Sequence, residues 1–181
     1  MTSHNNLLKD MPGVRSALID QYQWFIHTTP EENIKSISST GLEARSDDIA
    51  PSEVQKMFNL KRVPILCLHP LGATICPKGA CNNYILPIGS PDPKSVSLAV
   101  MGRNLPSRLG LDWSYEWRLI SNRFKMYSQD SITEFTLRIA NEFGSIVSYD
   151  NIPSQNLRIF NKGNAPDNPD TWMPLTDYKV L

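Results

Sequence analysis

Residues 24–44 read WFIHTTPEENIKSISSTGLEA and contain the best-specified strand and helix boundaries in the chain. It opens with aromatic and branched residues, the composition of a mostly buried strand, which we place at residues 22–26. His27 closes that apolar run, and a helix is expected to follow after an immediate turn. A strand that ends in histidine is a good way to hold an imidazole ring against a ligand. It is also an ordinary way for a chain to leave a sheet.

The helix after His27 carries several boundary signals. Thr29 is the expected N-cap, Pro30 stands at the first helical position, and Glu32 completes a Thr-x-x-Glu capping box. Two isoleucines mark the buried face and one glycine is placed to end the helix in a left-handed cap: Ile34, Ile37 and Gly41.

The remaining patterns indicate short strands mixed with a few helices. Strands are expected at 63–69, 95–101, 112–120, 145–149 and 156–160, and short helices at 14–22 and 50–60. Residues 128–144 fit both periods, and Gly144 as a stop favours a helix. Without regular βαβ alternation, this order predicts one α+β domain spanning 1–181. Residues 1–20 are then a peripheral N-terminal segment and residues 161–181 an irregular C-terminal tail.

The composition limits the partners and the cellular compartment that we expect. The 18 basic residues balance 18 acidic ones, so no global field attracts nucleic acid or a membrane. No apolar run approaches the ~20 residues that span a bilayer, and the first residues lack a secretory pattern. Three cysteines are too few for a disulfide framework and indicate a reducing interior. We therefore expect a cytoplasmic domain with no membrane partner, although a toxin delivered into a target cell would look the same.

Two segments carry a family resemblance. The order Phe25-Ile26-His27-Thr28-Thr29, then a helix with isoleucines, then Gly41-Leu42, resembles the first motif of the ADP-ribosyltransferase superfamily, on its diphtheria-toxin and poly-ADP-ribose polymerase side. RNA 2′-phosphotransferases share that scaffold. Residues 144–160, GSIVSYDNIPSQNLRIF, are similar to the end of the same fold, with a strand, a Tyr-Asp step, an Ile-Pro turn and a closing strand.

The resemblance implies a split antiparallel β-sheet with short flanking helices, and NAD as a substrate. It implies that His27 hydrogen-bonds the ribose and helps to seat the nicotinamide end, with Thr28 or Thr29 near the adenosine side. A tyrosine, Tyr84 or Tyr115, would cover the nicotinamide. The implied activity is transfer of ADP-ribose to a macromolecule, protein or nucleic acid, as in a toxin or a defence effector.

The sequence departs from the family at the acid. Ser145 stands where the family usually has the glutamate that polarises the ribose hydroxyl. A carboxylate is needed because breaking the glycosidic bond builds positive charge on the ribose. Glu142 is the first candidate and Glu116, among aromatic residues, is the second. The alternative is a non-catalytic binding or interaction module with the same fold.

The cysteines raise a separate hypothesis. Cys67 and His69, two apart on an expected strand, share one face, and Cys76 and Cys81 follow on the irregular segment. These four residues form a complete Cys3His ligand set for zinc. Their spacing is unlike the usual Cys-x2-Cys knuckle, and unpaired cysteines are among the most commonly buried residues, so a structural zinc is not expected.

Overall fold

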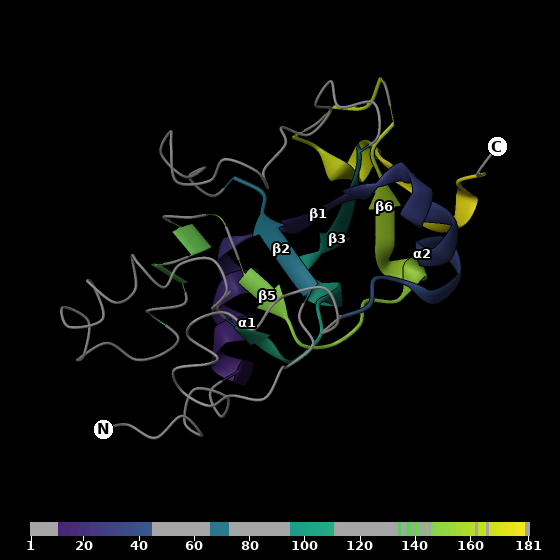
Figure 1. The fold of residues 1–181 in the computed structure, drawn as a ribbon. Helices are drawn as coiled ribbons and strands as arrows, with labels where there is room; N and C mark the ends of the chain where they lie inside the picture. The colour runs from purple at the N-terminus through teal and green to yellow at the C-terminus, as the bar shows by residue number, and fades with distance from the viewer. Residues whose placement is uncertain are drawn as a thin grey trace, which may run out of the picture.

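The computed structural model describes residues 11–44, 66–72, 95–110, 134, 137–138, 140–141, 144, 146–161, 163–165 and 167–179. Within these ranges lie two helices and seven strands, shown in Figure 1: α1 (Met11–Gln21), β1 (Trp24–Pro30), α2 (Ile34–Thr40), β2 (Leu66–Pro70), β3 (Ser95–Met101), β4 (Leu109–Gly110), β5 (Ile146–Ser148), β6 (Leu157–Ile159) and β7 (Met173–Pro174). Short 3-10 turns join several of them.

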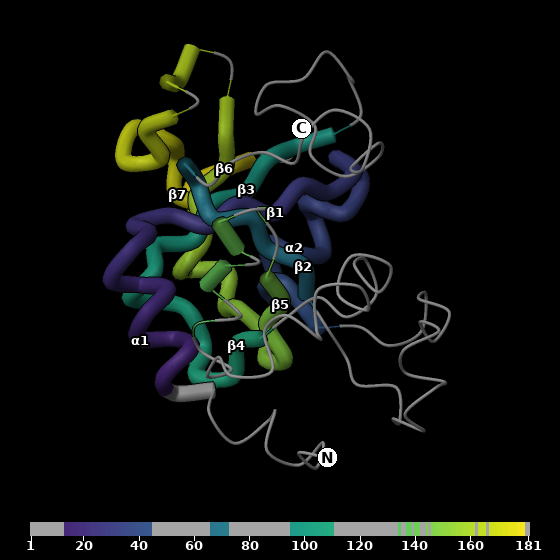
Figure 2. Tube along the Cα trace, turned by 90° about the vertical axis from the view of Figure 1, so that its left-hand side faces the viewer, coloured from purple at the N-terminus to yellow at the C-terminus, as the bar shows by residue number. Residues whose placement is uncertain are grey.

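The strands form one antiparallel series in the order β4-β5-β2-β1-β3-β6-β7. The central ladder joins β1 to β3 along the whole of both strands, from Trp24 opposite Met101 to Pro30 opposite Ser95. Helix α1 lies against β4, whereas α2 lies against the turn that precedes β6, and Figures 1 and 2 show the two helices well apart. The predicted α+β class is confirmed, and the sheet is antiparallel as expected.

The sheet has two faces, which alternate along each strand. We call the side that carries Phe25 the main-core face, because Phe25 packs there with the largest cluster of buried apolar residues. The side that carries Trp24 and Ile26 is the second face, and it holds a smaller cluster completed by Ala99 and Trp172. The first cluster also takes in the buried residues of both helices: Val14, Leu18, Ile34 and Ile37.

Strand β1 is longer than expected. It does not end before His27 but continues to Pro30, because β3 supplies a partner for every residue of it, including Ser97 for Thr28. The predicted capping box is wrong: a 3-10 turn follows Pro30, and no side chain caps it. The Thr29 hydroxyl instead accepts a hydrogen bond from the Asn33 side chain at 3.1 Å.

Most other expectations for this region are confirmed. Ile34 and Ile37 are buried, and the Gly41 N–H donates to the Ile37 carbonyl at 2.8 Å. Gly41 ends the helix as expected, but its φ of 84° with a ψ of −172° is an extended positive-φ conformation and not the predicted left-handed cap. The strand predicted at 95–101 matches β3. The described residues between 134 and 141 are helical, and Gly144 follows them at φ 64°. The helix predicted at 50–60 and the strand predicted at 112–120 lie outside the described residues.

Both ends of the chain take part in the core more than expected. The prediction of a peripheral N-terminal segment is wrong for α1, because Val14 and Leu18 are almost fully buried. The C-terminal tail is not irregular throughout, because β7 pairs with β6. The Trp172 ring lies edge-on to Phe160 at 5.2 Å, which buries it and anchors the tail on the second face.

Candidate functional site

Strands β1 and β2 pair at one end only. Phe25 lies opposite Pro70 and Ile26 opposite His69, and there the ladder stops. From that point β1 stays with β3, and β2 stays with β5. The two central strands therefore diverge, as Figure 1 shows, and they leave a gap within an otherwise continuous sheet.

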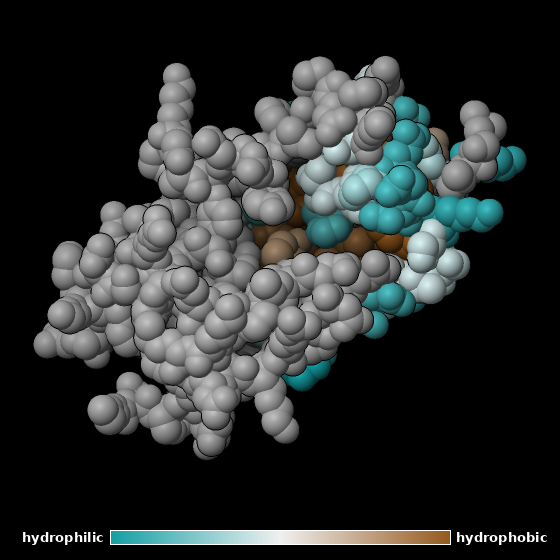
Figure 3. Space-filling model, viewed as in Figure 1, coloured by the Kyte–Doolittle hydropathy of each residue, from teal (hydrophilic) through white to brown (hydrophobic). Residues whose placement is uncertain are grey.

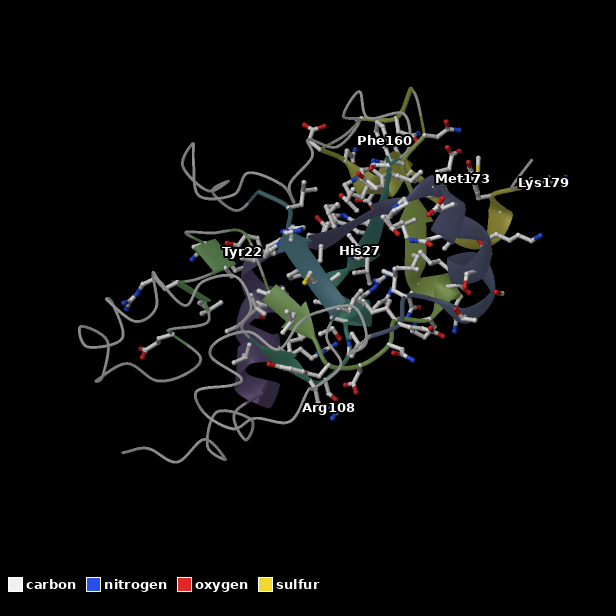
Figure 4. All side chains as sticks on the ribbon, viewed as in Figure 1. Tyr22, His27, Arg108, Phe160, Met173 and Lys179 are labelled. Carbon is white, nitrogen blue, oxygen red and sulfur yellow. The ribbon has the colours of Figure 1, made fainter. Side chains whose placement is uncertain are left out.

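His27 stands in this gap. Its ring Nδ1 lies 3.0 Å from the Cys67 carbonyl oxygen across the gap. A carbonyl can only accept a hydrogen bond, so Nδ1 carries the proton. In the neutral ring, Nε2 is then the unprotonated nitrogen and a hydrogen-bond acceptor. Figure 4 labels His27 in the space between the two strands.

The imidazole takes the place of a backbone bond. The Leu71 N–H donates to the Trp24 carbonyl at 2.9 Å, so alternate residues of β1, from Trp24 on, direct their backbone groups towards β2. By that alternation the next ladder pair would be Thr28 with Cys67. The Cys67 carbonyl, which would accept the Thr28 N–H, accepts the His27 ring N–H instead.

This substitution affects the backbone of Thr28. Its N–H and C=O both face the gap, and among the described residues no strand pairs with Thr28 on that side. An adjacent backbone donor and acceptor of this kind can bind a ligand that offers one acceptor and one donor.

Burial keeps the His27 ring neutral. Desolvation lowers its pKa below the usual value, the bond to the Cys67 carbonyl opposes that shift, and a charge on His69 would lower it further. The residue is half-buried and is not sealed in the core. In the view of Figure 1, Figure 3 shows a recess over the diverging strands, with hydrophobic residues within it and hydrophilic residues beside it over α2.

The two segments that carry the family resemblance meet in space. Leu42 and Ile152 exchange two backbone hydrogen bonds of 2.8 Å each. Gly41 fits there because it lacks a side chain: a Cβ on it would lie 2.3 Å from the Ile152 carbonyl oxygen. The Ala44 N–H adds a bond of 2.9 Å to the Asn151 side chain. The Gly-Leu and Ile-Pro steps are thus one junction between the end of α2 and the chain leaving β5.

The two threonines after His27 lie on opposite faces. Thr29 is buried on the main-core face, and its hydroxyl is engaged by Asn33. Thr28 lies on the second face beside Ser97, and it is half-buried. Of the two predicted contacts to a cofactor, the structure therefore leaves Thr28 the more accessible.

The predicted acids and the ring over nicotinamide lie outside the described residues: Glu116, Glu142, Tyr84 and Tyr115, together with Ser145. Gly144 is the described residue that follows Glu142 most closely in the sequence. Its carbonyl oxygen is 2.7 Å from the His69 ring. Because His69 pairs with Ile26, this contact ties the chain at Gly144 to the strand next to His27.

Asp150, the acid in the described part of the segment 144–160, pairs with an arginine outside the gap. Asp150 forms an ion pair with Arg108, which also donates to the Tyr149 carbonyl at 3.2 Å. The hydrogen bond from Arg108 lowers the pKa of the Asp150 carboxyl, so Asp150 is charged at neutral pH. Asp150 therefore serves to fix the turn after β5.

Cys67 and His69 share one face of β2, as predicted, and both are half-buried. Cys76 and Cys81 lie outside the described ranges. Within the described part of the chain, no group of three or more His, Cys, Asp or Glu side chains is placed to hold a metal ion. In that same part, no helix has the length and apolar character to cross a membrane.

Comparisons with known proteins give no match. No family model matches the chain, and neither a curated protein nor a solved structure does so. The function therefore has to be argued from the gap itself.

Proposed function

We propose that this chain is an NAD-dependent ADP-ribosyltransferase whose site is the gap between β1 and β2. The observation that carries the proposal is the substitution of the His27 ring for a ladder bond, which leaves the Thr28 N–H and C=O facing the gap. The carboxamide of nicotinamide offers one carbonyl and one NH2 group, so it is complementary to that backbone pair. Because Thr28 directly follows His27 in the chain, the Thr28 N–H and C=O lie at a fixed distance from His27.

His27 has a matching role in this proposal. With Nδ1 held by the Cys67 carbonyl, Nε2 accepts a hydrogen bond from a ribose hydroxyl. The bond between ribose C1 and the nicotinamide nitrogen breaks, and nicotinamide leaves with the electron pair. A hydroxyl or amine of the acceptor then forms a bond to C1, and its proton passes to the carboxylate or to water. Glu142 is the first candidate for the carboxylate that stabilises the positive ribose, and Glu116 is the second.

The proposed acceptor is a macromolecule, protein or nucleic acid, in keeping with a toxin or defence effector. A rival function uses the same gap but involves no turnover of NAD. In it the chain binds NAD as a recognition module, and the observation that favours it is Ser145 at the place where the family has its glutamate.

Nicotinamide release from NAD tests the proposal. His27→Gln keeps a donor for the Cys67 carbonyl but removes the acceptor nitrogen, so we expect turnover to fall by about 10²-fold or more. Lys35→Gln is the control for a polar substitution outside the gap, because Lys35 is an exposed residue of α2. We expect the control to retain most of the activity.

Variants of the two acids complete the assay. Glu142→Gln and Glu116→Gln should differ, with the catalytic acid losing most of the turnover. NAD binding without any release in the wild type would favour the recognition module. Release that is insensitive to His27→Gln would contradict the assignment of the site.

A further inference from the structure

Two donors on β1 are directed towards one acceptor on β2. The Cys67 carbonyl accepts the His27 ring N–H, with Nδ1 3.0 Å from the oxygen. The Thr28 backbone N–H is the donor that a continued ladder would bring to the same oxygen, because the pairing of Ile26 with His69 places Thr28 opposite Cys67. While the ring spans the gap, β1 and β2 cannot approach to the spacing of paired strands, about 4.8 Å.

The pairing of β1 with β3 fixes the direction of the Thr28 backbone. The Gly102 N–H donates to the Gln23 carbonyl at 2.8 Å, so the odd-numbered residues of β1 direct their backbone groups to β3. The Thr28 N–H and C=O are therefore directed to β2 already. Closing the ladder requires β2 to approach β1, but neither strand has to change its register.

Backbone connections that do not involve His27 join the two sides of the gap. One is the part of the β1–β2 ladder that is formed. Another is the pair of hydrogen bonds between Leu42 and Ile152, which joins the chain after α2 to the chain after β5. These connections keep the two sides aligned if the ring moves. The closed arrangement then follows from a local shift of the residues around Cys67.

The surroundings of His27 favour the open arrangement in the wild type. His27 lies opposite Leu98 on β3, and on closure it would also lie opposite Leu68 on β2. Both leucines are fully buried on the main-core face. An imidazole withdrawn from the Cys67 carbonyl would lie between these apolar side chains without its hydrogen bond, which is unfavourable. An alanine side chain at this position would carry no such penalty.

We propose that His27 is a positioning residue that holds the gap open, and that the β1–β2 ladder closes when its ring leaves the Cys67 carbonyl. In the closed arrangement the Thr28 N–H bonds to that carbonyl and is not available to a ligand. A ligand of the Thr28 backbone selects the open arrangement, so the closed fraction lowers its apparent affinity. The inference goes beyond the proposed function, because it holds for any such ligand and requires no turnover.

Amide hydrogen exchange of the ¹⁵N-labelled chain, followed by NMR, tests the inference. His27→Ala removes the ring, so the Thr28 N–H should gain the Cys67 carbonyl and exchange more slowly, by about tenfold or more. His27→Gln is the matched control, because it keeps a side-chain donor for that carbonyl and should exchange like the wild type. The Thr29 amide, which is directed to β3, is the internal reference. A loss of stability alone would make exchange faster, not slower.

A disulfide trap measures closure in a chain that retains His27. Thr28→Cys is combined with Cys76→Ser and Cys81→Ser, so that Cys67 is the other thiol. In a paired ladder the two Cα atoms lie about 5.5 Å apart, within the range of a disulfide. We expect oxidised glutathione to form the bond between positions 28 and 67.

Ser97→Cys in place of Thr28→Cys is the control for the trap. Ser97 lies opposite Thr28 on β3, one strand further from Cys67, so no disulfide should form.

The outcomes separate this inference from the proposed function. Slower Thr28 exchange in His27→Ala, restored by His27→Gln, supports closure even if the chain releases no nicotinamide. Thr28 exchange that is unchanged or faster in His27→Ala overturns closure, and nicotinamide release by the same protein would leave the transferase standing. If His27→Ala does not fold, the trap decides. A disulfide between positions 28 and 67 then supports closure, and its absence overturns it.

Discussion

Gly41→Ala is expected to destabilise the protein strongly, and the structure gives the size of the effect. Gly41 has φ 84° and ψ −172°, a region that is essentially restricted to glycine and costs another residue about 1–3 kcal/mol. The new Cβ would also lie 2.3 Å from the Ile152 carbonyl oxygen, so the backbone there must move. That movement breaks the two Leu42–Ile152 hydrogen bonds, worth about 1 kcal/mol each. The sum is about 3–5 kcal/mol.

Urea unfolding followed by tryptophan fluorescence measures this loss. Gly163→Ala is the control, because Gly163 also has a positive φ, of 101°, but nothing lies within 4 Å of its Cβ position. The control should lose only the conformational part, about 1–2 kcal/mol. The contact with Ile152 therefore accounts for the difference between the two variants. Equal losses would refute the junction between the Gly-Leu and Ile-Pro segments.

Three further predictions concern single residues. Burial lowers the pKa of His27 below the ordinary 6.5, so the unfolded chain binds more protons as the pH falls below that value, and stability falls with it. His27→Gln should flatten this loss in urea midpoints compared between about pH 7.5 and about pH 5.5; an unchanged slope would contradict it. Trp172→Ala removes a buried ring and should cost about 3–5 kcal/mol in the same assay, and a wild-type midpoint would show that the tail is not anchored there. Arg108 lowers the pKa of Asp150, so the pair stabilises above the ordinary carboxyl pKa of 3.8 and fades as the pH falls. Because the Arg108 side chain is 58% exposed, Asp150→Asn should cost no more than about 1 kcal/mol, and less in high salt; a loss that salt leaves unchanged would argue against the ion pair.

The sequence predicts elements best where side chains alone decide them. The apolar run Ser95–Met101 is a strand as predicted, because its side chains fill both faces of the sheet centre. Gly41 ends α2 as predicted, because few residues other than glycine accept its backbone angles. The strand end at His27 and the Thr29 cap were mispredicted for one reason. Strand β3 pairs with β1 up to Pro30, and this distant partner outweighs the local capping signals.

The site shows the same division. His27 stands out in the sequence as a polar residue that closes an apolar run, and it lies in the gap. Its partner, the Cys67 carbonyl, is a backbone atom and leaves no signal in the sequence. The Thr28 backbone has no strand partner on the gap side within the described part of the chain, because the β1–β2 ladder ends early, which depends on how β2 and β5 pair.

The central claim is that the carboxamide of nicotinamide forms hydrogen bonds with the backbone N–H and C=O of Thr28, which face the gap because the His27 ring occupies the Cys67 carbonyl. Titration of the ¹⁵N-labelled protein with nicotinamide, followed by two-dimensional NMR, tests it directly. The Thr28 amide should shift strongly and in proportion to occupancy, because its proton gains a carbonyl partner, and the Ile37 amide in α2 should stay in place. A Thr28 amide that does not move while nicotinamide saturates the protein would contradict the claim, as would an absence of nicotinamide binding.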